Sequence, residues 1–235
     1  LASPAMAVDW NFYGSARMAT YYNSRDFNNG TPEDLDAGGL ALKDGFDEDD
    51  QVQWDLQSNS RLGATVRAEN LRGQFELALR STEDGGDETV NTRRLFGTWD
   101  FGAATLKVGK DYTPVSQFIS GQVFAGDAGL LGNGAAYGDR NPQLSLSFGG
   151  FEIALVNPEG GAIRNIDTGD VDEYLPKMEA GWGMSFDTWN FNLMGGFQYY
   201  SIEDVKSLET GKNEDIDVYS WTIGADAGFN FGPGY

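Results

Sequence analysis

The chain has 235 residues, of which 40% are hydrophobic and 13% aromatic, and its formal net charge is −20. It contains no Cys and no His, which excludes Ser-His-Asp and Cys-His catalysis, thiolate metal sites and disulfides. We therefore expect no enzyme activity, no metal and no cofactor. The negative charge repels phosphates, and the 16 basic residues are scattered along the chain, so nucleic acid is not an expected partner.

The first seven residues end in Ala5-Met6-Ala7, the small-x-small form that signal peptidase cleaves. We interpret residues 1–7 as the remnant of a signal peptide and Val8 as the first residue of the mature chain. A short disordered tail is the alternative. Uninterrupted apolar runs reach only four residues, as in Ile153 to Val156, whereas a membrane-spanning helix needs about 20.

Residues 8–22 alternate between apolar and polar positions for 15 residues, much longer than the usual strand of about five or six. Trp10 and Tyr22 fall on the same face, twelve residues apart. In a strand tilted by about 40° this spacing is roughly 30 Å along the membrane normal. The pattern therefore predicts a membrane-spanning strand with an aromatic residue at each interface.

Residues 51–69 repeat this alternation, with Trp54 and Leu56 on one face and Arg61 and Arg67 on the other. The second face is too polar for a dry core. Arg17, Arg67 and Arg80 fall on the polar face of their strands, so we expect them to form a basic wall facing the lumen. The apolar face predicts lipid contact for ten large side chains: Trp10, Phe12, Trp54, Leu56, Phe75, Leu77, Trp99, Leu193, Phe197 and Trp221.

The connections between the predicted strands alternate between short and long. Short turns are expected at 70–73, near Gly102, at Gly149-Gly150 and at 187–190. The long connections are polar: 23–50, 81–91, 111–142, 157–177 and 201–216. Short turns at one rim and long loops at the other are typical of outer-membrane barrels, whereas a soluble sandwich has shorter strands and less unequal loops.

The predicted fold is all-β, an antiparallel transmembrane β-barrel formed by residues 8–235. Ten strands are expected, at 8–22, 51–69, 74–80, 92–101, 103–110, 143–149, 151–156, 178–187, 190–200 and 217–231. Residues 231–235 resemble a turn that leads into an eleventh strand, which suggests the N-terminal part of a larger barrel. A complete ten-stranded barrel is the alternative.

Several stretches resemble the general porins of Gram-negative bacteria, the trimeric 16-stranded diffusion channels, in a divergent form like that of sulfate-reducing bacteria. Phe12-Tyr13-Gly14 resembles their first strand and Ser60-Arg61-Leu62-Gly63 their second. Residues 101–114, which include Gly109-Lys110, are similar to the strand that leads into the family's third loop. Arg140-Asn141, followed by Phe148-Gly149-Gly150-Phe151, resembles the next strand pair.

The resemblance implies an outer-membrane homotrimer in which the third loop, here residues 111–142, folds into the barrel as a constriction. It places Arg61, Lys110 and Arg140 on the wall that faces this loop. The family's acidic loop motif is missing, and Asp127 is the carboxylate near the middle of the loop. The preference between anions and cations, and the identity of the solute, stay open.

The other long loops are acidic. Residues 44–50 are rich in Asp but lack the Asp-x-Asp-x-Asp-Gly spacing of a calcium loop, so we interpret them as part of a solvated rim. The leading functional prediction is a water-filled channel for passive diffusion of small hydrophilic solutes and ions. A secreted soluble β-protein that binds carbohydrate through its aromatic residues is the alternative.

Overall fold

The computed structural model describes residues 8–25, 49–57, 59–80, 89–118, 134–160, 170–206 and 211–232. All regular secondary structure in these ranges is β-strand, and none of them contains a helix long and apolar enough to cross a membrane. The strands are β1 Asp9–Ser15, β2 Met18–Arg25, β3 Asp49–Leu56, β4 Arg61–Ala68, β5 Leu71–Arg80, β6 Thr89–Asp100, β7 Thr105–Tyr112, β8 Arg140–Phe148, β9 Phe151–Val156, β10 Val171–Asp172, β11 Lys177–Ser185, β12 Trp189–Lys206 and β13 Asn213–Phe229.

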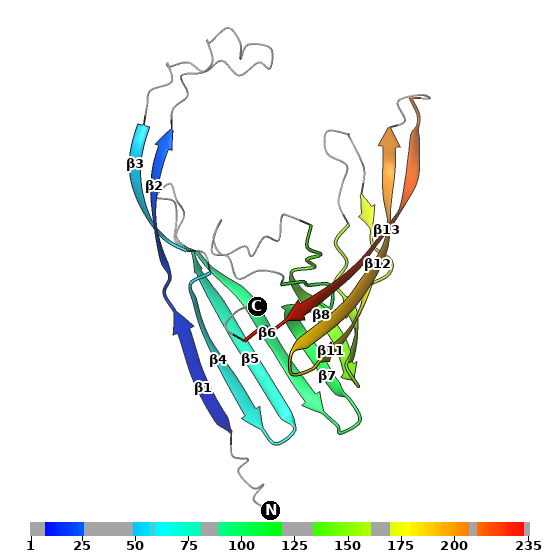
Figure 1. Cartoon of the computed structure of the whole chain (residues 1–235). Helices are drawn as coiled ribbons and strands as arrows, with labels where there is room; N and C mark the ends of the chain where they lie inside the picture. The colour runs from blue at the N-terminus through cyan, green and yellow to red at the C-terminus, as the bar shows by residue number, and fades with distance from the viewer. Residues whose placement is uncertain are drawn as a thin grey trace, which may run out of the picture.

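Eleven of these strands form one antiparallel sheet in the order β1-β4-β5-β6-β7-β8-β9-β11-β12, with β13 and the short β10 both paired to β12. The sheet is strongly curved, and its short turns lie together at one end (Figure 1). In the part of the chain that the structure describes, β1 and β13 are the two edges and do not pair with each other. β2 and β3 form a separate hairpin that continues beyond β1 and β4.

Alternation of side chains gives the sheet an apolar face and a polar face. On the apolar face Met178 stands between Leu155 and Phe197, and Phe197 is paired with Trp221. These side chains are exposed, up to 74% for Trp221. We call this the outer face, and the opposite face, which carries Glu76, Ser145 and Glu179, the inner face.

All ten predicted strands are present, and their order and antiparallel pairing agree with the prediction. The first short turn lies at Glu69-Asn70, slightly earlier than predicted, because Ala68 is already paired with Leu71. The two-residue β10 falls inside a segment predicted as loop. Residues 1–7, interpreted as a signal-peptide remnant, lie outside the described ranges.

The strands predicted at 8–22 and 51–69 are each divided in two. Ser15 is opposite Arg61 and Met18 is opposite Leu56, so two residues on one strand face four on the other. Ser60, which is fully buried, bridges the break, since its hydroxyl accepts a hydrogen bond from Arg17 N at 2.9 Å. Ser60 therefore connects the β1–β4 pair with the β2–β3 pair across the break.

Candidate functional site on the inner face

A β-bulge brings two consecutive arginines to the inner face. Glu76 on β5 is opposite Arg94, but the next residue, Leu77, is opposite Thr92. Arg93 is therefore an extra residue in β6, and a bulge of this kind interrupts the alternation of side chains. As a result Arg93 and Arg94 both reach carboxylates of the inner face.

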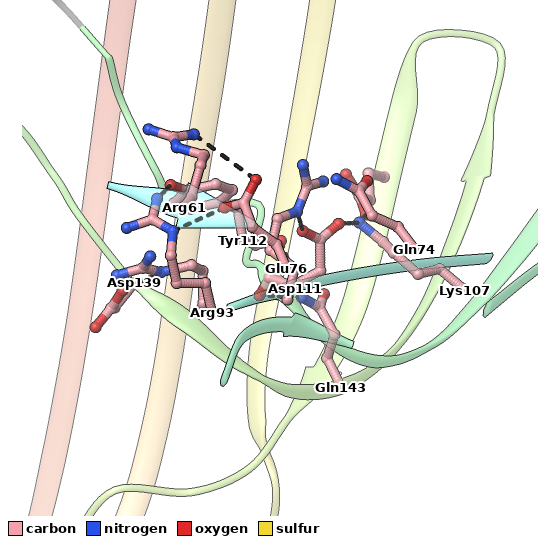
Figure 2. A network of polar contacts seen from close by, with 12 residues as sticks. Arg61, Gln74, Glu76, Arg93, Lys107, Asp111, Tyr112, Asp139 and Gln143 are labelled. Atoms are coloured by element: carbon pink, nitrogen blue, oxygen red, sulfur yellow. Dashed lines mark hydrogen bonds and ion pairs between the residues drawn. The ribbon is translucent and has the colours of Figure 1, made fainter. Parts of the chain in front are cut away.

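The first of these carboxylates is Glu76, whose side chain is 4% exposed. Arg93 Nε lies 2.7 Å from Glu76 Oε1, and Arg61 Nη1 lies 3.7 Å from Oε2. Tyr13 on β1 donates its hydroxyl proton to Oε2 at 3.0 Å and accepts a hydrogen bond from Gln74 at 2.6 Å. Two cations and a phenol thus surround one buried carboxylate, so the local charge is positive (Figure 2).

The second carboxylate is Asp111, at the end of β7. Arg94 Nε lies 2.7 Å from Oδ1 and Lys107 Nζ lies 3.2 Å from Oδ2. Lys107 also contacts Glu152 on β9, at 3.0 Å. Tyr112 lies between the group around Asp111 and the one around Glu76, since its hydroxyl accepts a hydrogen bond from Arg93 Nη2 at 3.2 Å and its ring centre lies 5.6 Å from the guanidinium carbon of Arg94. Figure 2 shows Asp111 and Glu76 within one network of polar contacts.

The described ends of the segment between β7 and β8, residues 113–118 and 134–139, lie against the inner face of the opposite strands. Residues 113–118 and 134–139 pair with each other through Thr113 N to Asp139 O and Gln117 N to Ala136 O. Val115 N then donates to the buried carboxylate of Glu179 on β11, at 2.9 Å. These contacts attach both described ends of the segment to the wall.

Close packing at this attachment requires glycine. A Cβ atom on Gly138 would lie 2.2 Å from Thr113 Oγ1, and one on Gly196 would lie 3.2 Å from Glu179 Cγ. Lys177 Nζ lies 3.1 Å from the other oxygen of Glu179, so the buried carboxylate is partly neutralised.

Aromatic residues and an ion pair occupy the junction between this segment and β8. Arg140 Nε lies 3.0 Å from Asp139 Oδ1, and its guanidinium carbon lies 5.3 Å from the centre of the Tyr112 ring. Although partial burial acts in the opposite direction, the hydrogen bond and charge of Arg140 hold the pKa of Asp139 below its ordinary value. Burial raises the pKa of Tyr137 to about 12.

Of the residues predicted at the constriction, Arg61 and Arg140 lie in the polar network, whereas Lys110 does not. Lys110 is opposite Leu95 on β6 and Pro142 on β8, in the outer row of β7 that contains Val108. The register therefore places Lys110 in the outer row of β7, not on the inner face where the constriction was predicted. Asp127 lies outside the described residues.

The three residues predicted as a basic wall have different outcomes. Arg67 falls in the inner row, between Asp9 on β1 and Arg72 on β5. Arg17 lies in the break between β1 and β2, where its backbone contacts Ser60. Arg80 is paired with Thr89 through the ladder, but its side chain is outside the described part of the structure.

The central residues of the network were not identified from the sequence. Glu76 and Lys107 are on the polar positions of their strands, so alternation could have revealed them. Arg93 shares the parity of the outward Leu95, and only knowledge of the bulge places it inside. The sequence pattern did not indicate a role for Glu179, because that role depends on where residues 113–118 lie in the fold.

No protein-family model and no curated protein matches the chain. Among solved structures the chain is similar to the outer membrane channel DcaP of Acinetobacter baumannii, with a TM-score of 0.65 and 15% sequence identity. The match covers 99% of this chain and 62% of that channel, so the chain spans less than two thirds of its length. The chain therefore has the fold of an outer-membrane β-barrel channel.

Proposed function

We propose that the protein is an outer-membrane porin that forms a water-filled channel for passive diffusion of small hydrophilic solutes and ions. The observation that carries this proposal is the division of one curved sheet into an exposed apolar outer face and a charged inner face. Such a sheet is stable when lipid covers the apolar face and water covers the charged face. The absence of His and Cys in the chain is consistent with transport that makes or breaks no bond.

The constriction in this proposal is formed by the segment 111–142 and the wall that faces it. The attachment of Val115 to Glu179 supports an inward position for the described ends of the segment. Arg61 and Arg140 are the basic residues proposed at this level, with Asp127 as the acidic residue of the loop. Charges in a narrow, poorly screened space bias ion selectivity.

Conductance measurements test this proposal. The purified protein is added to a planar lipid bilayer, where we expect discrete current steps and, under a salt gradient, a measurable reversal potential. In parallel, membranes that contain the protein are extracted with salt and then with detergent. Release without detergent, together with no conductance, would contradict the porin and favour the secreted carbohydrate-binding alternative.

We also propose a homotrimer. Gly14 and Ala16 are small residues on the exposed side of the N-terminal strand region, and small side chains allow a close approach between subunits. A detergent-corrected mass of three chains by light scattering is the expected result. A mass equal to one chain would contradict the trimer without affecting the channel.

A further inference from the structure

A second feature of the inner face is a cavity between residues 114–118 and the end of the sheet that carries the short turns. This open cavity of about 650 Å³ lies between residues 114–118 and the ends of β8, β9, β11, β12 and β13. This volume is within the usual range of small-molecule sites. The cavity is separate from the cluster around Glu76, which does not contribute to its lining.

Asp226 on β13 is held in a fixed orientation at this cavity. Asn192 Nδ2 donates to its Oδ1 at 2.7 Å, and Gln117 Nε2 lies 3.4 Å from Oδ2. Gln117 is itself buried and fixed, because its Oε1 accepts a hydrogen bond from Ala136 N at 2.8 Å. Neither amide carries a charge, and none of the ion pairs among the described residues includes Asp226.

The charged residues that line the cavity are all acidic. The residues that line the cavity include two carboxylates, Asp226 and Glu152, and no lysine or arginine. Glu152 is paired with Lys107 at 3.0 Å, so Asp226 is the carboxylate without a cationic partner among the described residues. Ser116 adds a buried hydroxyl that has no hydrogen-bond partner within the described structure. The cavity therefore presents a carboxylate whose negative charge has no cationic partner among the described residues.

Glycines create the room for this arrangement. A Cβ atom on Gly183 would lie 2.7 Å from Asn192 Oδ1, and one on Gly224 would lie 3.3 Å from Gln117 Nε2. Side chains at these two positions would displace the amides that orient Asp226. The exposed ring of Phe118 also lines the cavity and supplies an apolar surface for the body of a ligand.

We propose that this cavity binds a small organic cation, an amine or a guanidinium solute, with Asp226 as the residue that bears the charge. A metal ion fits less well, because no group of three acidic residues in the described ranges is arranged to hold one. An ammonium group, in contrast, needs one oriented carboxylate and neighbouring oxygen acceptors. The inference rests on the proposed channel, since the site would lie on the path of the solute.

The test uses the full-length protein in detergent and in bilayers, with 1,4-diaminobutane as the probe and 1,4-butanediol as the neutral control of the same length. Calorimetry in detergent is expected to detect binding of the diamine and not of the diol. In bilayers the diamine is expected to produce brief blocks of the current. Because calorimetry does not require conduction, it tests the site even if the channel proposal fails.

The variant Asp226→Asn keeps the shape and an acceptor oxygen but removes the charge, and we expect it to weaken diamine binding by at least about tenfold. Asp217→Asn is the matched control, with the same change on the same strand nine residues away, or roughly 30 Å. We expect its affinity to stay within about twofold of the parent. Ser147→Lys leaves Asp226 intact but brings an ammonium group to the lining, and we expect it to abolish binding.

Equal binding of diamine and diol, or unchanged affinity in both Asp226→Asn and Ser147→Lys, would overturn the inference. Should Asp226→Asn fail to fold, as judged by circular dichroism, Ser147→Lys alone decides the outcome. Current steps without diamine binding would contradict the proposed site but support the porin. Diamine binding without any current would support the site but contradict the porin.

Discussion

Glu76 shows how single residues set the charge of the inner face. Its carboxylate is buried and contacts Arg93 at 2.7 Å and Arg61 at 3.7 Å, so one negative charge serves two cations. The side chain of Arg61 is 28% exposed, compared with 13% for Arg93. Arg61 is thus the member of the pair whose charge would act most directly on ions in the proposed channel.

Replacement of Arg61 tests this assignment. Arg61→Gln removes one positive charge, and we expect the permeability ratio of cations over anions to rise by about twofold at low salt. Arg61→Glu reverses the charge, so the ratio is expected to rise further. Reversal potentials under a salt gradient measure the ratio. The effect is expected to shrink above about 1 M salt, where the Debye length falls to about 3 Å.

Arg72→Gln is the control, since Arg72 on β5 shares the inner face with Arg61 but is exposed and lies at the short-turn end of the sheet. It makes the same charge change away from the inward segment and should have the smaller effect. If Arg72→Gln shifts the reversal potential as much as Arg61→Gln does, the narrow level is not at Arg61.

Strands and turns were largely predictable, because alternation and glycine turns are local properties of the sequence. The break between β1 and β2 could not be predicted, because the numbers of unpaired residues there hide it from the alternation pattern. Two extra residues on one strand and four on the other are both even numbers, so apolar positions continue in phase across the break. The inward attachment at Glu179 was equally hidden, since Val115 and Glu179 are 64 residues apart in the chain.

The attachment of the β7–β8 segment to β11 is testable at the level of this element. Glu179→Ala removes the acceptor of Val115 N, and the loss of a hydrogen bond to a charged group costs about 2 kcal/mol. We expect the segment to leave the wall more often, which increases single-channel conductance and the size of neutral solutes that pass.

Glu179→Gln is the matched control, because its amide oxygen still accepts from Val115 N. Its conductance is expected to stay close to that of the parent protein. Solute size is measured by swelling of liposomes in sugars of increasing mass. An unchanged size limit in Glu179→Ala would show that this contact does not hold the segment in place.

On the scale of the whole molecule, most large apolar side chains of the described residues lie outside a core. The largest fully buried side chains are Ile202, Val156, Ser60 and Ser145, whereas aromatic residues such as Phe12 are exposed, at 71%. Eight of the ten side chains predicted to contact lipid are among the exposed large apolar residues, and Phe75 and Leu77 are intermediate. A sheet of this composition is stable only when another phase covers its outer face.

Lipid contact can be measured with spin labels in the protein reconstituted in vesicles. Labels at Phe12, Leu155 and Trp221 on the outer face are expected to be accessible to oxygen, which partitions into lipid. Labels at Gln74 and Ser145 on the inner face should instead be accessible to a water-soluble nickel chelate, or to neither reagent where packing is tight. Accessibility of the outer labels to the nickel chelate alone would contradict the barrel.

The bulge in β6 also determines which length changes the strand can tolerate. Arg93 is the one residue of this strand segment that the ladder with β5 skips, since Thr92 and Arg94 are opposite the consecutive residues Leu77 and Glu76. Deletion of Arg93 would leave every other pair in register and remove a single lumen charge. Homologues could thus gain or lose a pore charge by a one-residue insertion or deletion at this position.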